Sequence, residues 1–93
     1  MSVSEHDVAI FEEGFMLVAV NFEAVQALGE KTLWEAIQGH PWVVEQGIPL
    51  AVVYQMEDGA IRAFGDKDII GGVSQMNFAD ITWGHTLTLE WAD

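Results

Sequence analysis

The three histidines, His6, His40 and His85, are the side chains best suited to acid–base or metal chemistry near neutral pH. No two of them have the close spacing that places a metal-binding pair on one helix face, and we expect none of them to have a sequence-local Cys or Ser partner. His85 is the most interesting, because strand alternation points it inward beside Trp83 and Leu87. A hydrogen-bonded core or turn residue is the expected role there. His40 precedes a proline and is expected at a helix boundary.

The segment 65–72, Gly-Asp-Lys-Asp-Ile-Ile-Gly-Gly, alternates carboxylates with glycines and faintly resembles a calcium loop. An EF-hand loop needs a third oxygen ligand and a bidentate Glu, and Ile70 and Asn77 stand at those positions. The spacing and the lysine of a phosphate-binding loop are also missing. We therefore expect surface loops around a short apolar anchor at 69–70. The sequence predicts no catalytic, metal-binding or cofactor-binding residue.

Four tryptophans are unusually many for a domain of this size. Trp34, Trp83 and Trp91 fall on apolar stripes and are expected in the core. Trp42 follows His-Pro outside any strong periodic pattern. It is therefore the best candidate for an exposed aromatic anchor at a protein interface.

Carboxylates gather at the expected loop tips. One interpretation is a solvated acidic coat that keeps an apolar domain dispersed, since charged turns are common in any protein. The sharper interpretation is an array of negative charge that occupies the Arg- and Lys-lined cleft of a partner. The candidate partner-binding residues are then Glu12, Glu13, Trp42, Glu57, Asp58, Asp66 and Asp68.

The overall charge supports an acidic shell around a folded core. Fifteen Asp and Glu residues against three Lys and Arg give a net charge of -12, while 51% of the 93 residues are hydrophobic. A disordered acidic tail would have far fewer apolar residues. Lys31, Arg62 and Lys67 are too scattered to form a basic patch, so we expect neither direct nucleic-acid binding nor adsorption to an anionic membrane.

Length and composition fit one domain over residues 1–93. The absence of cysteine excludes disulfides and thiolate metal sites, which suits a reducing compartment. The longest apolar run, residues 15–20, is far shorter than the roughly 20 residues that span a bilayer, and the chain starts without the basic region of a signal peptide. We expect a soluble cytoplasmic protein.

The elements that would hold these residues begin with a β-hairpin over residues 8–11 and 15–20. Gly14 stands at the last position of a three-residue loop, where a left-handed conformation is required. Both faces of these strands are apolar, as in strands covered on both sides. A helix capped by Asn21 and ended by Gly29 follows.

Two shorter helical segments are expected next. Thr32 begins a Thr-x-x-Glu capping box, and Gly39 with Pro41 ends that helix. Residues 41–46 favour one more helical turn, although their Trp-Val-Val sequence equally suits a strand.

Residues 50–57 and 60–64 form the clearest hairpin, because Asp-Gly at 58–59 fits the positive φ angles of a two-residue type I′ turn. That turn places Tyr54 opposite Ala63.

The C-terminal stretch has the best alternation in the chain. A strand bent at Gly84, or two strands joined by an odd-length loop, puts all of its apolar side chains on one buried face. These are Ala79, Ile81, Trp83, Leu87, Leu89 and Trp91. Together the elements predict an α+β fold, β-β-α-α-β-β-β, with an antiparallel sheet of about five or six strands and two or three short helices on one face.

Charge, size and the lack of a catalytic set favour a non-enzymatic module that docks an acidic surface on a basic protein partner. In size and charge the chain resembles the small acidic inhibitors that phages and mobile elements encode, without sharing a family motif. That resemblance implies an inhibitor that masks a nucleic-acid-binding surface.

Two alternatives remain open. Hydrophobicity beyond the needs of a 93-residue core fits a structural or homo-oligomeric subunit joined through strand edges or exposed aromatics. An enzyme or small-ligand site would need His85 beside Asp80 or Glu90, and strand alternation places those carboxylates on the opposite face.

Overall fold

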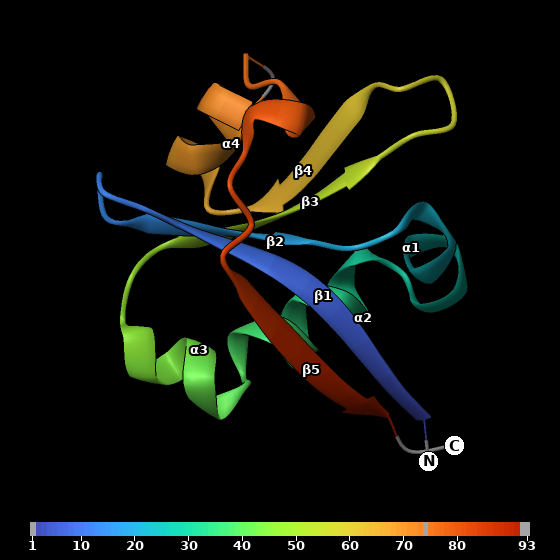
Figure 1. Ribbon diagram of the computed structural model, residues 1–93. Helices are drawn as coiled ribbons and strands as arrows, with labels where there is room; N and C mark the ends of the chain where they lie inside the picture. Colours follow the sequence, from blue (N-terminus) through green and yellow to red (C-terminus); the bar gives the residue numbers. More distant parts are fainter. Residues whose placement is uncertain (1, 74, 92–93) are drawn as a thin grey trace.

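The N-terminal hairpin forms as expected in the computed structural model, which describes residues 2–73 and 75–91 (Figure 1). It consists of β1 (Ser2–Phe11) and β2 (Phe15–Ala19), with Phe11 paired to Phe15. Gly14 has a φ of 95°, and its N–H donates to the Phe11 carbonyl at 3.0 Å, which confirms the three-residue loop. β1 begins at Ser2, well before the expected start at residue 8, because its first half pairs with the last strand, β5 (His85–Trp91).

Three helices follow, α1 (Phe22–Leu28), α2 (Glu30–Gln38) and α3 (Pro41–Gln46). The Asn21 cap of α1 is confirmed, since its Oδ1 accepts from the Ala24 N–H at 2.7 Å. The capping box at Thr32 is wrong: α2 starts directly after Gly29 and has no side-chain cap. The strand alternative for residues 41–46 is also wrong, because Pro41 begins a helix whose cap is His40.

The sheet contains five strands in the order β4-β3-β2-β1-β5, with β3 at Leu50–Gln55 and β4 at Ile61–Gly65. The predicted α+β class is confirmed, with one difference. β2 and β3 pair in parallel, whereas the other pairs are antiparallel. The three helices return the chain to the end of the sheet where β2 began, so β3 runs in the same direction as β2.

The β3–β4 register differs from the prediction by one residue. Tyr54 pairs with Arg62 rather than with Ala63. The turn is a three-residue loop like the first one: the Met56 N–H donates to the Ala60 carbonyl at 2.8 Å, and Gly59 has a φ of 88°. No other residue type has a positive φ among the described residues, so Asp58 cannot adopt the type I′ conformation.

The segment after β4 contains a helix that the sequence did not predict, α4 (Lys67–Val73). Asp66 caps it, since its Oδ1 accepts from the Asp68 N–H at 2.9 Å. Ile69 and Val73, four residues apart, are buried against the sheet. Two consecutive glycines oppose helix formation, and this tertiary burial overrides them.

The helices lie on both faces of the sheet, and each face has its own core. α2 and α3 cover one face, which we call the helical face, and Val8, Val18 and Val52 are fully buried there. α4 covers the opposite face over β3 and β4, against Leu17, Ala51 and Val53. The prediction of helices on one face therefore holds for α1 to α3 only.

The C-terminal segment changes faces before its strand begins. A 3-10 turn, η1 (Phe78–Asp80), and residues 81–84 precede β5. Ile81 and Trp83 pack with α4 on its face, whereas Leu87 and Leu89 are buried on the helical face. The alternation in β5 is confirmed, but the expected single buried face is wrong, because residues 81–84 pass from one side of the sheet to the other (Figure 1).

Candidate functional site

The six predicted loop-tip carboxylates do not converge on one surface. Because β2 and β3 are parallel, the β1–β2 turn and the β3–β4 turn lie at opposite ends of the sheet (Figure 1). The end of β4 lies beside the start of β3, where the Asp66 N–H donates to the Leu50 carbonyl. One end therefore holds Glu12, Glu13, Asp66 and Asp68, and the other holds Glu57 and Asp58.

Trp42, the predicted exposed anchor, is half-buried and packs against the core of the helical face. Its ring centroid lies 5.7 Å from that of His85. Its backbone N–H donates to His40 Nδ1 at 3.1 Å, because it occupies the first turn of α3. Only part of this side chain remains accessible to a partner.

A pocket of about 450 Å³ lies beside the β1–β2 turn, and we call it the acidic pocket. Phe11, Met76 and Ile81 provide apolar lining, and three carboxylates stand among the lining residues. Its full lining is Ala9, Ile10, Phe11, Glu12, Glu13, Met76, Asn77, Asp80, Ile81 and Thr82.

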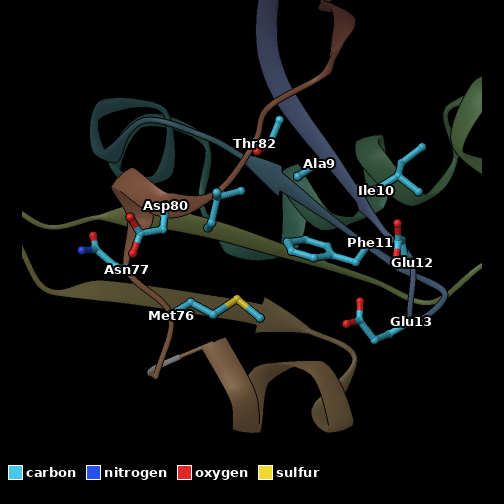
Figure 2. Close-up of a pocket in the computed structure, with 10 residues that line it drawn as sticks. Ala9, Ile10, Phe11, Glu12, Glu13, Met76, Asn77, Asp80 and Thr82 are labelled. Carbon is cyan, nitrogen blue, oxygen red and sulfur yellow. The ribbon is translucent and has the colours of Figure 1, made fainter.

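The carboxylates stand on two sides of this pocket. Figure 2 shows Glu12 and Glu13 on one side, Asp80 and Asn77 on the other, and the Phe11 ring between them. The Asn77 side chain accepts from the Ala79 N–H at 3.1 Å and so begins the η1 turn that carries Asp80. Among the described residues that line the pocket there is no Lys or Arg. It therefore has an apolar floor and an uncompensated negative rim.

A second group of carboxylates extends this negative surface along β1. Glu5 and Asp7 are exposed on the face of the sheet that α4 leaves open, and Glu90 of β5 is exposed opposite Val3. Val3 itself is 60% exposed on that open area. The sequence interpretation missed Glu5 and Asp7 because it began β1 at residue 8. Their alternation with Ser4, His6 and Val8, which point to the other face, was the available signal.

His6 is the most deeply buried histidine, at 5% exposed, and has a structural hydrogen-bond network. Its Nε2 lies 2.9 Å from Ser4 Oγ, which also accepts from Trp91 Nε1 at 2.9 Å. The expectation that no serine accompanies a histidine is therefore wrong. Burial lowers the pKa of His6, opposed by a hydrogen bond to the Ala19 backbone and by the charge of Asp7.

His40 and His85 are 45 residues apart in the sequence but line the same pocket. His40 and His85 line a hollow of about 310 Å³ together with Trp42 and residues 86–88. His85 is exposed at the start of β5, not in the core as the alternation predicted. Asp80, which an enzymatic site at His85 would require nearby, lines the acidic pocket instead.

In the described part of the chain, no three His, Cys, Asp or Glu side chains are grouped so that they could hold a metal ion. No helix within residues 2–73 and 75–91 is long and apolar enough to cross a membrane. Comparison with protein-family models, curated proteins and solved structures finds no match to this chain.

Proposed function

We propose that this chain is a non-enzymatic protein-binding module that docks the acidic pocket on a basic surface of a protein partner. The acidic pocket is the observation that carries the proposal: an apolar floor at Phe11 and Met76 lies between carboxylates on two sides. Arg and Lys have the matching form, since their aliphatic stems pack on apolar surface while their charged heads meet carboxylates.

The charge distribution favours this partner chemistry over others. A net charge of -12 repels nucleic acids and anionic lipids and attracts basic proteins, which raises their association rate at low salt. Glu5, Asp7 and Glu90 extend the negative surface beyond the pocket. The partner's basic surface is therefore broader than one side chain.

A matched pair of variants tests the proposal. The chain is immobilised, and the proteins that it captures from a cell extract at low salt are eluted with salt. We expect basic partners whose affinity falls about tenfold, or ~1.4 kcal/mol, on the double substitution Glu12→Gln and Glu13→Gln. Glu57→Gln with Asp58→Asn removes the same charge from the similar turn at the opposite end and serves as the control.

If the two double variants weakened partner binding equally, binding would depend on the overall negative charge and not on the acidic pocket. Capture that is insensitive to salt would contradict the proposal outright, because exposed charge pairs are screened.

The finer form of the proposal is an inhibitor that acts in the cytoplasm and masks a nucleic-acid-binding surface, as phage-encoded acidic inhibitors do. Carboxylates spaced along the pocket and β1 would occupy the Arg and Lys side chains that otherwise contact phosphates. A competition experiment, in which this chain and DNA or RNA compete for a captured partner, tests whether the chain masks the nucleic-acid-binding surface. A ternary complex with undiminished nucleic-acid binding would leave a binding module that does not inhibit.

A further inference from the structure

β5 presents an open edge of the sheet. It is the last strand of the order β4-β3-β2-β1-β5 and pairs only with β1 among the described strands. Such an edge leaves every second backbone N–H and carbonyl free to pair with another strand. Its seven residues, His-Thr-Leu-Thr-Leu-Glu-Trp, include no Lys and no Pro, and their pairing with β1 is continuous. This edge therefore lacks the lysine, the proline and the bulge that commonly block edge strands.

The other edge of the sheet differs. β4 has five residues, carries Arg62 and ends at Gly65. Both α4 and α2 contact it. An added strand thus finds a longer and less protected template on β5.

The pocket at His40 and His85 lies along the backbone of β5. Its lining includes the four consecutive residues 85–88, whose side chains alternate between the two faces of the sheet. A hollow bordered by consecutive residues of β5 fits a position beside the free edge of this strand. The half-buried ring of Trp42 forms part of the other wall.

The two faces beside this edge have different chemistry. On the helical face lie Trp42 and the buried Leu87, which suit an apolar side chain. On the open face lie the exposed carboxylates of Glu90, Glu5 and Asp7. No Lys or Arg belongs to β1 or β5.

We propose that β5 receives an extended segment of a partner protein as a sixth strand of the sheet. Backbone hydrogen bonds along the edge supply affinity, and alternating side chains supply specificity. The segment places apolar side chains toward the His40–Trp42–His85 pocket and Lys or Arg side chains over Glu90 and its neighbours. This interaction goes beyond the acidic pocket and uses a different part of the chain.

Charge argues for such a partner over a second copy of this chain. Each copy carries a net charge of -12, so two copies joined at β5 would bring like charges together. A cationic segment would instead be attracted electrostatically to the acidic chain. If the chain formed dimers through β5 without any peptide, the occupant of this edge would be a second copy of the chain instead of a cationic segment.

The test is a titration of the full, isotope-labelled chain with an end-capped peptide of alternating Arg and Val, followed by backbone amide NMR. We expect shifts concentrated in residues 85–91 and around Trp42, with slowed amide exchange in β5. The control peptide has the same composition in two blocks, all Arg and then all Val. It cannot present one cationic and one apolar row and should not slow exchange in β5.

A pair of variants checks the position of the site. Thr88→Lys with Glu90→Lys, both exposed, should weaken the alternating peptide at least tenfold by placing cations beside the added strand. Gln38→Lys with Glu57→Lys makes the same change in charge at exposed positions elsewhere and should leave binding within about twofold.

Several results would overturn the inference. Shifts confined to residues 9–13 and 76–82 would place the peptide in the acidic pocket, which supports the proposed function and removes the β5 site. Equal effects of the two double variants, or β5 shifts that depend on the chain's own concentration without peptide, would also refute it.

Discussion

Glu12 and Glu13 show how far sequence reasoning reaches at the scale of single residues. Their position at a loop tip was predicted from the Glu-Glu-Gly turn and is confirmed. Their neighbour Asp80 was not predicted, because it approaches only after the chain has passed through α4 and η1. No local pattern encodes that approach. Two of the three carboxylates that line the pocket were therefore predicted from the sequence.

His6 makes the stability depend on pH in the same direction as the acid unfolding that carboxylates cause, since stability is lost as the pH falls. Burial lowers its pKa below the usual value of about 6.5, so the folded state disfavours protonation while the unfolded state accepts the proton. The stabilising effect of His6 is present above about pH 6.5 and declines as the pH falls from there toward the folded-state pKa.

We therefore expect the difference in unfolding free energy between the wild type and His6→Gln to be largest near pH 8 and to shrink as the pH falls below about 6.5. Urea unfolding of both proteins across this range measures it. Subtracting one protein from the other cancels the titration of the shared carboxylates. A difference that stays constant with pH would show that protonation of His6 does not couple to folding.

Gly65 is a position where a side chain cannot be accommodated. Its φ is 124°, and a Cβ there would lie 2.7 Å from Trp34 Cζ3 and 3.0 Å from the Leu50 carbonyl oxygen. We expect Gly65→Ala to lower the free energy of unfolding by about 2–3 kcal/mol, from backbone strain and overpacking. Chemical denaturation checks this. Gly84→Ala is the control, because a Cβ at residue 84 meets nothing within 4 Å; equal losses would contradict the explanation.

At the scale of elements, local signals predicted starts and ends better than registers. Asn21, Gly29 and Gly39 stand at helix ends as expected, because capping is a local interaction. The β3–β4 register was wrong, since Glu-Asp-Gly suits both a two-residue and a three-residue loop. Only the pairing of Met56 with Ala60 distinguishes them.

α4 was missed because its sequence opposes a helix. Gly71 and Gly72 lie inside it, exposed, and a Cβ at either position meets nothing within 4 Å. We expect Gly71→Ala to stabilise the chain by about 0.5–1 kcal/mol, because alanine restricts the unfolded state and favours the helix. Thermal unfolding measures the change.

Gly47→Ala is the matched comparison for that prediction. It also has open space around it, but its φ of 62° strains any other residue, so stability should fall. A destabilising Gly71→Ala would contradict the helical assignment of this segment.

At the scale of the whole molecule, the charge of -12 leaves carboxylates largely uncompensated. The ion pair of Lys31 with Glu35 has a separation of 4.0 Å between exposed side chains and contributes little. Self-repulsion should therefore lower stability at low salt.

We expect the melting temperature to rise when NaCl is increased from low concentration to about 0.15 M, where the screening length is about 8 Å. Glu5→Gln with Asp7→Asn should reduce this dependence, because it removes two neighbouring charges from β1. Calorimetry at several salt concentrations measures both. A melting temperature that falls with added salt would show that attractive pairs outweigh repulsion.

The methionine methyl groups provide the most direct measurement of the central proposal. Met76 lines the acidic pocket, Met56 adjoins the Glu57–Asp58 turn at the opposite end, and Met16 is fully buried. A titration of methyl-labelled protein with a short end-capped arginine peptide therefore compares the pocket, a control turn and the core in one spectrum. We predict a saturable shift of the Met76 methyl group, while Met56 and Met16 stay in place. Equal shifts at Met56 and Met76, or binding that leaves Met76 unmoved, would contradict the acidic pocket as the docking site.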